Sequence, residues 1–233
     1  MATVVVEINP RKMLKALLYM IALLLSLNVL GIIINAHFDY RIAKGMAKII
    51  DFDLEKNIPT LYSTLALIFS SALLFFIASE YRKTKQHNIL WFTLSAIFLF
   101  LAVDETASLH EHLLKPTRDF LGTSGLLYYA WVIPYSIGLI ALGVVYSKFL
   151  HSLPKKTKWL FMTSGAIFVL GAIGFEMLSG WQAEVYGKRT YLYMIFYTCE
   201  EALEMTGIAI FIYALLSHIV NEMGYRRIVI SSD

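Results

Sequence analysis

The sequence predicts an all-α membrane protein, a polytopic bundle of six transmembrane helices with both termini in the cytoplasm. The 233-residue chain is 58% apolar and 16% charged, and its mean hydropathy of +0.63 lies outside the range of soluble domains. Six apolar segments approach the length of about 20 residues that a bilayer requires. The basic residues are also distributed unequally between the two sets of connecting segments.

The whole chain, residues 1–233, is expected to form a single transmembrane domain. Its spans are predicted at about 13–36, 59–78, 89–105, 125–145, 159–178 and 191–217. The first is about twice as long as the apolar region of a signal peptide and lacks a small-residue cleavage site, which favours an uncleaved helix. The third is long enough only if it continues through Asp104 and Glu105. Pro134 lies within the fourth and predicts a kink there.

Between the first two spans, residues 38–57 mix apolar residues with charges of both signs. This pattern predicts an amphipathic segment on the outer surface. Its lysines, Lys44, Lys48 and Lys56, are candidates to offset nearby acidic charge.

The orientation follows from the positive-inside rule. With a cytoplasmic N-terminus, 12 of the 20 Lys and Arg residues lie on the inner side, whereas 13 of the 17 acidic residues lie outside or in the outer halves of the spans. A bacterial cytoplasmic membrane is the predicted location, with membrane lipids as surroundings and other membrane subunits as an open class of partner. The net charge of +3 gives no indication of a nucleic-acid partner.

Carboxylates gather at one depth of the predicted bundle. Asp104 and Glu105 end the third span and Glu176 lies near the end of the fifth, while the sixth, running the opposite way, carries three glutamates in its first turns. All therefore approach the outer face. Because an ionisable group inside a membrane span costs several kcal/mol, such groups are candidates for a functional site.

Helical phase brings these groups onto common faces at 100° per residue. On the sixth helix, one arc of roughly 100° holds Tyr197, Glu200, Glu201 and Glu204. If the third helix continues, an arc of roughly 120° holds Asp104, Glu105, Ser108, Glu111 and His112. That phase directs His110 elsewhere.

Carboxylates and imidazoles from several helices are the ligands that Fe, Mn or Zn use in proteins. We therefore expect a divalent metal held by Asp104, Glu105, His112, Glu176, Glu200 and Glu204. The supporting polar network is expected to comprise Ser108, Glu111, Tyr197, Glu201 and His37. The spacing of di-iron bundles is absent, since Ser108 and not His follows Glu105 by three residues, and no H-E-x-x-H motif occurs.

Structural explanations compete with this prediction. Asp104 and Glu105 are suited to capping a helix end, and Glu176 to reaching the interface near Trp181. Glu111 and His110 fit a solvated loop. The glutamates of the sixth span fit hydrogen bonding between helices.

The stretches LAVDETASLHEHL and EEALEMTGIAIFIYAL resemble an uncharacterised group of bacterial multi-pass membrane proteins that pairs an LDE-x-x-x-x-HE-like motif with an EE-x-x-E-x-x-G-like motif. Val103 replaces the leucine of the first motif. The resemblance covers the third and sixth spans and implies no activity, but it implies that the two motifs form one unit. The late H-x-x-x-H of seven-helix ceramidase-like hydrolases is absent from the last span.

Three functions remain open. The first is a membrane enzyme whose metal site supports hydrolytic or oxidative chemistry on a lipid-like or small apolar substrate. The second is an accessory or assembly subunit of a larger membrane complex. The third is a proton- or cation-coupled carrier, although acidic motifs at the outer ends of both the third and sixth spans do not fit an inverted repeat.

Overall fold

A computed structural model describes residues 3–37, 45, 47–83 and 88–231 as a helical bundle with a short terminal ribbon. Six helical stretches in this part of the chain are long and apolar enough to cross a membrane, as predicted. Their bounds are α1 Pro10–His37, α3 Ile58–Lys83, α4 Asn88–Ala107, α6 Val132–Ser152, the continuous stretch Lys155–Tyr186 and α9 Tyr191–Asn221. The continuous stretch consists of α7 Lys155–Val169, the π-helix η2 Leu170–Phe175 and α8 Glu176–Tyr186.

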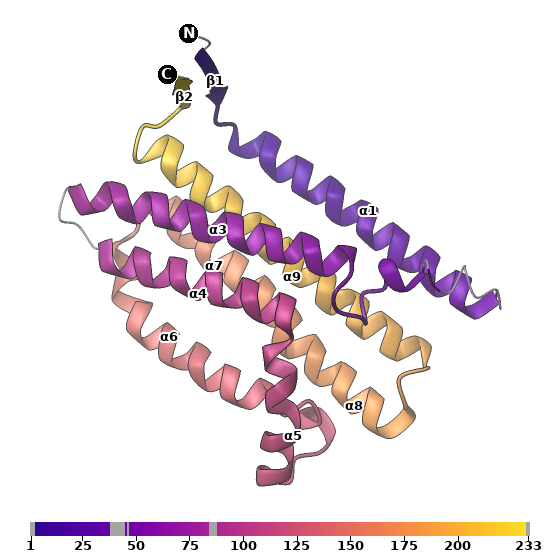
Figure 1. Ribbon diagram of the computed structural model, residues 1–233. Coiled ribbons are helices and arrows are strands. Elements are labelled where there is room, and N and C mark those ends of the chain that lie inside the picture. The colour runs from indigo at the N-terminus through magenta and orange to yellow at the C-terminus, as the bar shows by residue number, and fades with distance from the viewer. Residues whose placement is uncertain (1–2, 38–44, 46, 84–87, 232–233) are drawn as a thin grey trace.

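Shorter elements lie at the two ends of the bundle. At one end are α5 Leu109–Leu121 and the 3₁₀ turn η1 Gly125–Leu127; we call this the α5 end (Figure 1). At the other, β1 Thr3–Glu7 pairs antiparallel with β2 Arg227–Ser231 and brings the two termini together (Figure 1). We call this the terminal end.

The fourth span begins later than predicted. Gly125 has a φ of 63° and opens the turn η1, so α6 starts only at Val132. Pro134 therefore lies in the first turn of α6, where its missing N–H breaks no hydrogen bond within the helix. Because Pro134 does not lie in mid-span, the physical reason for expecting a kink there does not apply.

The centre of the bundle is α9. In its most apolar 18-residue stretch, 67% of the residues are buried. The corresponding share is 17% for α6 and for Lys155–Tyr186. It packs against α1, α3, α7 and α8. The helix that carries three of the predicted site carboxylates is thus the one most enclosed by other helices.

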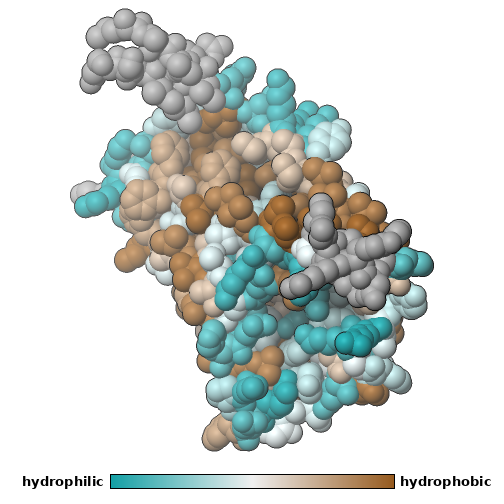
Figure 2. Space-filling model, turned by 45° about the vertical axis from the view of Figure 1, so that its right-hand side comes forward, coloured by the Kyte–Doolittle hydropathy of each residue, from teal (hydrophilic) through white to brown (hydrophobic). Residues whose placement is uncertain are grey.

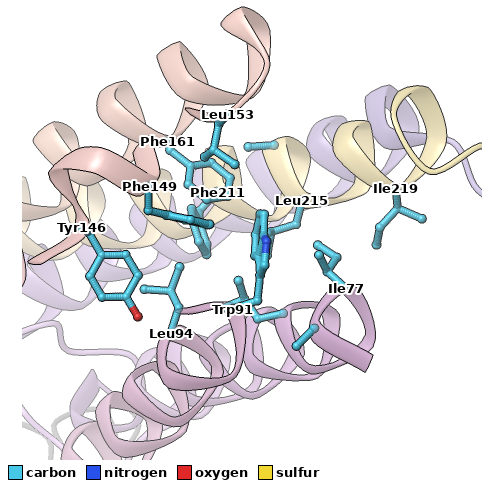
Figure 3. Close-up of a cluster of buried hydrophobic side chains, with 13 residues drawn as sticks. Ile77, Trp91, Leu94, Tyr146, Phe149, Leu153, Phe161, Phe211, Leu215 and Ile219 are labelled. Carbon is cyan, nitrogen blue, oxygen red and sulfur yellow. The ribbon is translucent and has the colours of Figure 1, made fainter. Parts of the chain in front are cut away.

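Near the terminal end, the largest cluster of buried apolar residues surrounds Trp91 of α4, which is 1% exposed. Figure 3 shows its indole between side chains of α4, α6, α7 and α9, with Phe149 and Leu215 among its neighbours. His218 of α9 lies beside this indole, 5.3 Å between ring centroids, and bonds the hydroxyl of Tyr81 at 2.9 Å. The polar group is therefore satisfied inside the apolar cluster.

The surface carries the pattern expected of a membrane protein. Figure 2 shows hydrophobic residues gathered across the middle of the visible face and hydrophilic residues toward its two ends. Large apolar side chains on outward faces, among them Ile137 and Ile140 of α6, are more than half exposed. Because the exposure of large apolar side chains to water is unfavourable, such residues fit a lipid environment.

Candidate functional site

A cavity of about 630 Å³ lies between α3, α4, α6, α7 and α9 and reaches the α5 end. This volume is typical of pockets for small molecules. Its walls are of two kinds. Toward the middle of the bundle they are apolar, with Leu67, Ile97, Leu142, Phe168 and Ile208 among the lining residues.

Toward the α5 end the walls of the same cavity are acidic. Five of the six predicted metal ligands line it: Asp104, Glu105, Glu176, Glu200 and Glu204. Among the predicted supporting residues, Tyr197, Glu201 and Glu111 line it as well. The helical phase of α9 accounts for this, because Tyr197, Glu200, Glu201 and Glu204 lie on one face of a regular helix.

The histidines are placed opposite to the prediction. His110 lines the cavity, whereas His112 is exposed and bonds the carbonyl of Ser108, the residue before its helix. The cause is Ser108, whose left-handed backbone (φ 55°, ψ 41°) separates α4 from α5 and resets the helical phase. Ser108 itself is buried, and its hydroxyl has no partner among the described residues.

His37, the last predicted supporting residue, is not part of the cavity wall. It is exposed at the end of α1 and bonds the carbonyl of Ile33 in its own helix. Residues 38–44 and 46, which include Lys44, lie outside the described residues. Neither Lys48 nor Lys56 lines the cavity.

His110 lies between two carboxylates. Its Nδ1 is 3.4 Å from Oδ2 of Asp104, its Nε2 is 3.5 Å from Oε1 of Glu55, and its backbone N–H donates to Oδ1 of Asp104 at 2.8 Å. Burial lowers the pKa of His110, but the two carboxylates outweigh it and raise this pKa above its ordinary value. The imidazole is therefore held toward its cationic form.

An aromatic residue links His110 to the buried glutamates. The His110 ring lies 4.7 Å from the ring of Trp131, whose indole N–H donates to Oε1 of Glu176 at 2.7 Å. Ser179 donates to Oε2 of Glu200 at 3.2 Å. Trp131 and Ser179 thus hydrogen-bond the carboxyl groups of Glu176 and Glu200, respectively.

The π-helix η2 lies directly before Glu176. Gly171 lies in η2 against α9, and a Cβ there would be 2.7 Å from the carbonyl oxygen of Glu200. The π-turn has more residues per turn than an α-helix and so shifts the helical phase before Glu176, the first residue of α8. Glu176 thus follows directly on the π-turn and lines the cavity.

Two acidic residues that the sequence did not indicate as ligands enter the cavity from the segment before α3. Asp53 accepts a hydrogen bond from the hydroxyl of Tyr193, and Glu55 contacts His110. Asn28 of α1 holds this segment in place: its Oδ1 accepts the Phe52 N–H at 3.0 Å, and its Nδ2 donates to Thr198 at 3.0 Å. The feature of the sequence that could have indicated these two residues is the set of acidic residues in the predicted amphipathic segment, residues 38–57.

Lys188, in the loop between α8 and α9, is the lysine that lines this cavity within the described chain. Its ammonium lies 5.5 Å from the ring centres of both Tyr129 and Tyr193. Burial lowers its pKa, but Asp53, Tyr129 and Glu176 outweigh this and raise it above its ordinary value. Burial raises the pKa of Glu55 to about 7, with the His110 charge opposing.

The carboxylates surround a common space without closing on one point. Within residues 3–37, 45, 47–83 and 88–231, no three His, Cys, Asp or Glu side chains are arranged as a group that could hold a metal ion. The arrangement does provide hydrogen-bond acceptors facing a cavity whose other half is apolar.

The family described as "Domain of unknown function (DUF8692)" matches residues 16–219, which include all six helical spans in whole or in large part. The chain therefore belongs to this family. No curated protein and no solved structure matches it.

Proposed function

We propose that this member of the DUF8692 family binds a lipid-like molecule inside the membrane, with a cationic head group at the α5 end of the cavity and an apolar part in its inner half. One observation carries the proposal: a single cavity combines a carboxylate-rich end with an apolar wall. An amphiphile has the same division of polarity, and a small-molecule pocket is normally apolar with a few convergent polar groups.

The charge of the head group follows from the lining. Nine acidic side chains line the cavity, against two basic ones in the described chain, Lys188 and His110. Carboxylates crowded into poorly hydrated space need protons or cations to compensate their charge. An amine or quaternary ammonium would compensate the charge of several of them, and an amine could also donate hydrogen bonds to acceptors on several walls of the cavity.

An unpaired group independently supports a ligand in this place. Ser63 of α3 lines the cavity, is 4% exposed, and its hydroxyl has no hydrogen-bond partner among the described residues. Because a buried hydroxyl without a partner costs about 1–3 kcal/mol, a bound polar group would offset that cost.

A divalent metal at the acidic end is the second candidate. The observation that favours it is the presence of Asp104, Glu105, Glu176, Glu200 and Glu204 on the wall of one cavity. Iron, manganese or zinc bound there would supply Lewis-acid or redox chemistry for hydrolysis or oxidation of the lipid-like molecule. It would require the side chains to move closer together than they are.

The test is analysis of protein purified without chelator or metal-affinity resin. Extracted lipids are identified by mass spectrometry, and metals are measured on the same sample. Binding of dodecylamine is then followed by thermal stability, since a ligand that binds the folded state raises the melting temperature. The variant is Glu204→Gln, and the matched control is Glu222→Gln, an exposed glutamate outside the cavity.

We expect dodecylamine to stabilise the unmodified protein and Glu204→Gln to weaken its binding by about tenfold, the effect of one charge-assisted hydrogen bond. Glu222→Gln should bind normally. Stoichiometric iron, manganese or zinc that Glu204→Gln loses would establish the metal instead. If the unmodified protein bound no amine and contained no metal, both candidates would be refuted.

The orientation forms part of the proposal. The paired termini are proposed to face the cytoplasm and the α5 end to face outward, in a bacterial cytoplasmic membrane, as the distribution of Lys and Arg favours. The head group would then lie in the outer half of the bilayer. Reaction of an impermeant amine reagent with Lys188, but not with Lys155 or Lys156, in intact cells would agree with this; the reverse pattern would contradict it.

A further inference from the structure

α6 is held at its two ends and stands away from the bundle between them. It forms no extensive contact with any other described helix. Near the terminal end, Tyr146 and Phe149 belong to the Trp91 cluster, and the Tyr146 hydroxyl donates to the Leu90 carbonyl at 2.8 Å. At the α5 end, Tyr135 packs against His110. Figure 1 shows α6 at the edge of the bundle.

In the middle of α6 the cavity reaches the molecular surface. Gly138 of α6, Gly165 of α7 and Phe100 of α4 all line the cavity and are also exposed. Gly165 lies ten residues from Lys155 at the start of α7, about 15 Å along the helix. Since the apolar core of a bilayer is about 30 Å thick, the opening faces lipid and not water.

Two glycines leave this opening wide. A Cβ at Gly138 or Gly165 would meet no atom within 4 Å. By contrast, a Cβ at Gly207 would be 2.8 Å from the backbone N of Phe168. Gly207 thus lets two helices touch, whereas Gly138 and Gly165 border empty space.

We infer that the cavity opens sideways into the bilayer beside α6, and that Gly138 and Gly165 make room there for the hydrocarbon chain of a single-chain cationic amphiphile. This inference rests on the proposed function and adds the route of entry and the residues that limit the chain. The occupant is an amphiphile because the opening is continuous with the acidic end, so one molecule reaches both.

The inference is tested by filling the opening. Gly138→Leu and the double variant Gly138→Leu/Gly165→Leu place side chains in the space, and Gly143→Leu is the matched control. Gly143 lies on the same helix, is exposed, has open space around it and does not line the cavity. Binding of dodecylamine and of butylamine is measured by thermal stability for each protein.

We expect the double variant to bind dodecylamine at least tenfold more weakly than Gly143→Leu and to bind butylamine as the unmodified protein does. Equal dodecylamine binding by the double variant and the control would overturn the inference and leave the proposed function standing. Failure of the unmodified protein to bind dodecylamine would instead remove the proposed function.

A second measurement needs no substitution. A long-chain amine with a diazirine at the chain end is bound to the unmodified protein and photolysed, and the labelled residues are identified by mass spectrometry. Labelling of Leu139 and Leu142, which line the cavity, is expected. Labelling confined to Ile140 and Val144, which are exposed on α6 outside the cavity, would contradict the sideways opening.

Discussion

Replacing Asn28 with alanine should release the segment that carries Asp53 and Glu55 into the cavity. Asn28 is 1% exposed and accepts the backbone N–H of Phe52, which is 4% exposed. Without the amide, this N–H has no other described partner and is too deeply buried for water to replace it. An unsatisfied buried donor costs about 1–3 kcal/mol.

The substitution is expected to weaken the attachment of this segment to the bundle more than the stability of the bundle as a whole. A loss of 1–3 kcal/mol would raise the population of the detached segment by about 5- to 150-fold. When opening is fast compared with cleavage, the proteolysis rate follows that population. Trypsin should therefore cleave Asn28→Ala after Lys48 and Lys56, at either side of Phe52, faster by a similar factor.

Thr198→Val is the control. It removes the bond from Asn28 Nδ2 and keeps the bond to Phe52, so it should destabilise the protein without increasing cleavage after Lys56. Cleavage and chemical unfolding are compared in one detergent. If Asn28→Ala matched the unmodified protein in both, the bond to Phe52 would not hold the segment, and the account of how Asp53 and Glu55 are positioned would be wrong.

Two further predictions concern packing and pH. Gly171→Ala should lower the free energy of unfolding by about 1–3 kcal/mol because its Cβ would lie 2.7 Å from a backbone oxygen. Gly143→Ala, whose Cβ would lie in open space, should raise the free energy of chemical unfolding by up to about 1 kcal/mol. Equal effects of the two substitutions would refute the packing argument. Glu55 keeps its proton up to about pH 7 in the folded state but loses it near its ordinary pKa of 4.5 when unfolded, so the melting temperature should fall as pH rises through this window. Glu55→Gln should reduce that fall, Glu222→Gln should not, and an undiminished fall in Glu55→Gln would count against the burial of Glu55.

Much of the architecture could be predicted because membrane spans obey simple rules of length and hydropathy. The acidic face of α9 could also be predicted, since Glu200, Glu201 and Glu204 follow the phase of an uninterrupted helix. The same reasoning failed at His110 and His112, where the left-handed backbone of Ser108 ends one helix and begins another. A serine in that conformation leaves no pattern in the sequence.

The contributions of distant segments were hidden for a different reason. Trp131 and Lys188 reach the cavity through tertiary packing of loops, and no local spacing relates them to the glutamates of α9. The π-turn before Glu176 was likewise unpredictable, because it depends on the close approach of Gly171 to α9. The charged residues of segment 38–57 are evident in the sequence, but their pattern does not show that Asp53 and Glu55 line the cavity and that Lys48 and Lys56 do not.

The arrangement of α9 explains why a stable bundle retains an acidic cavity. Gly171 and Gly207 bring the helical stretch Lys155–Tyr186 against the backbone of α9. At the terminal end, the Trp91 cluster joins α3, α4, α6, α7 and α9 into one apolar core. Glu200, Glu201 and Glu204 line the cavity, beside which α6 stands away from the bundle. A molecule that compensates their charge is expected to enter either beside α6 or through the α5 end. The two routes are distinguished by whether Gly138→Leu weakens the binding of a long-chain amine more than that of a short-chain amine.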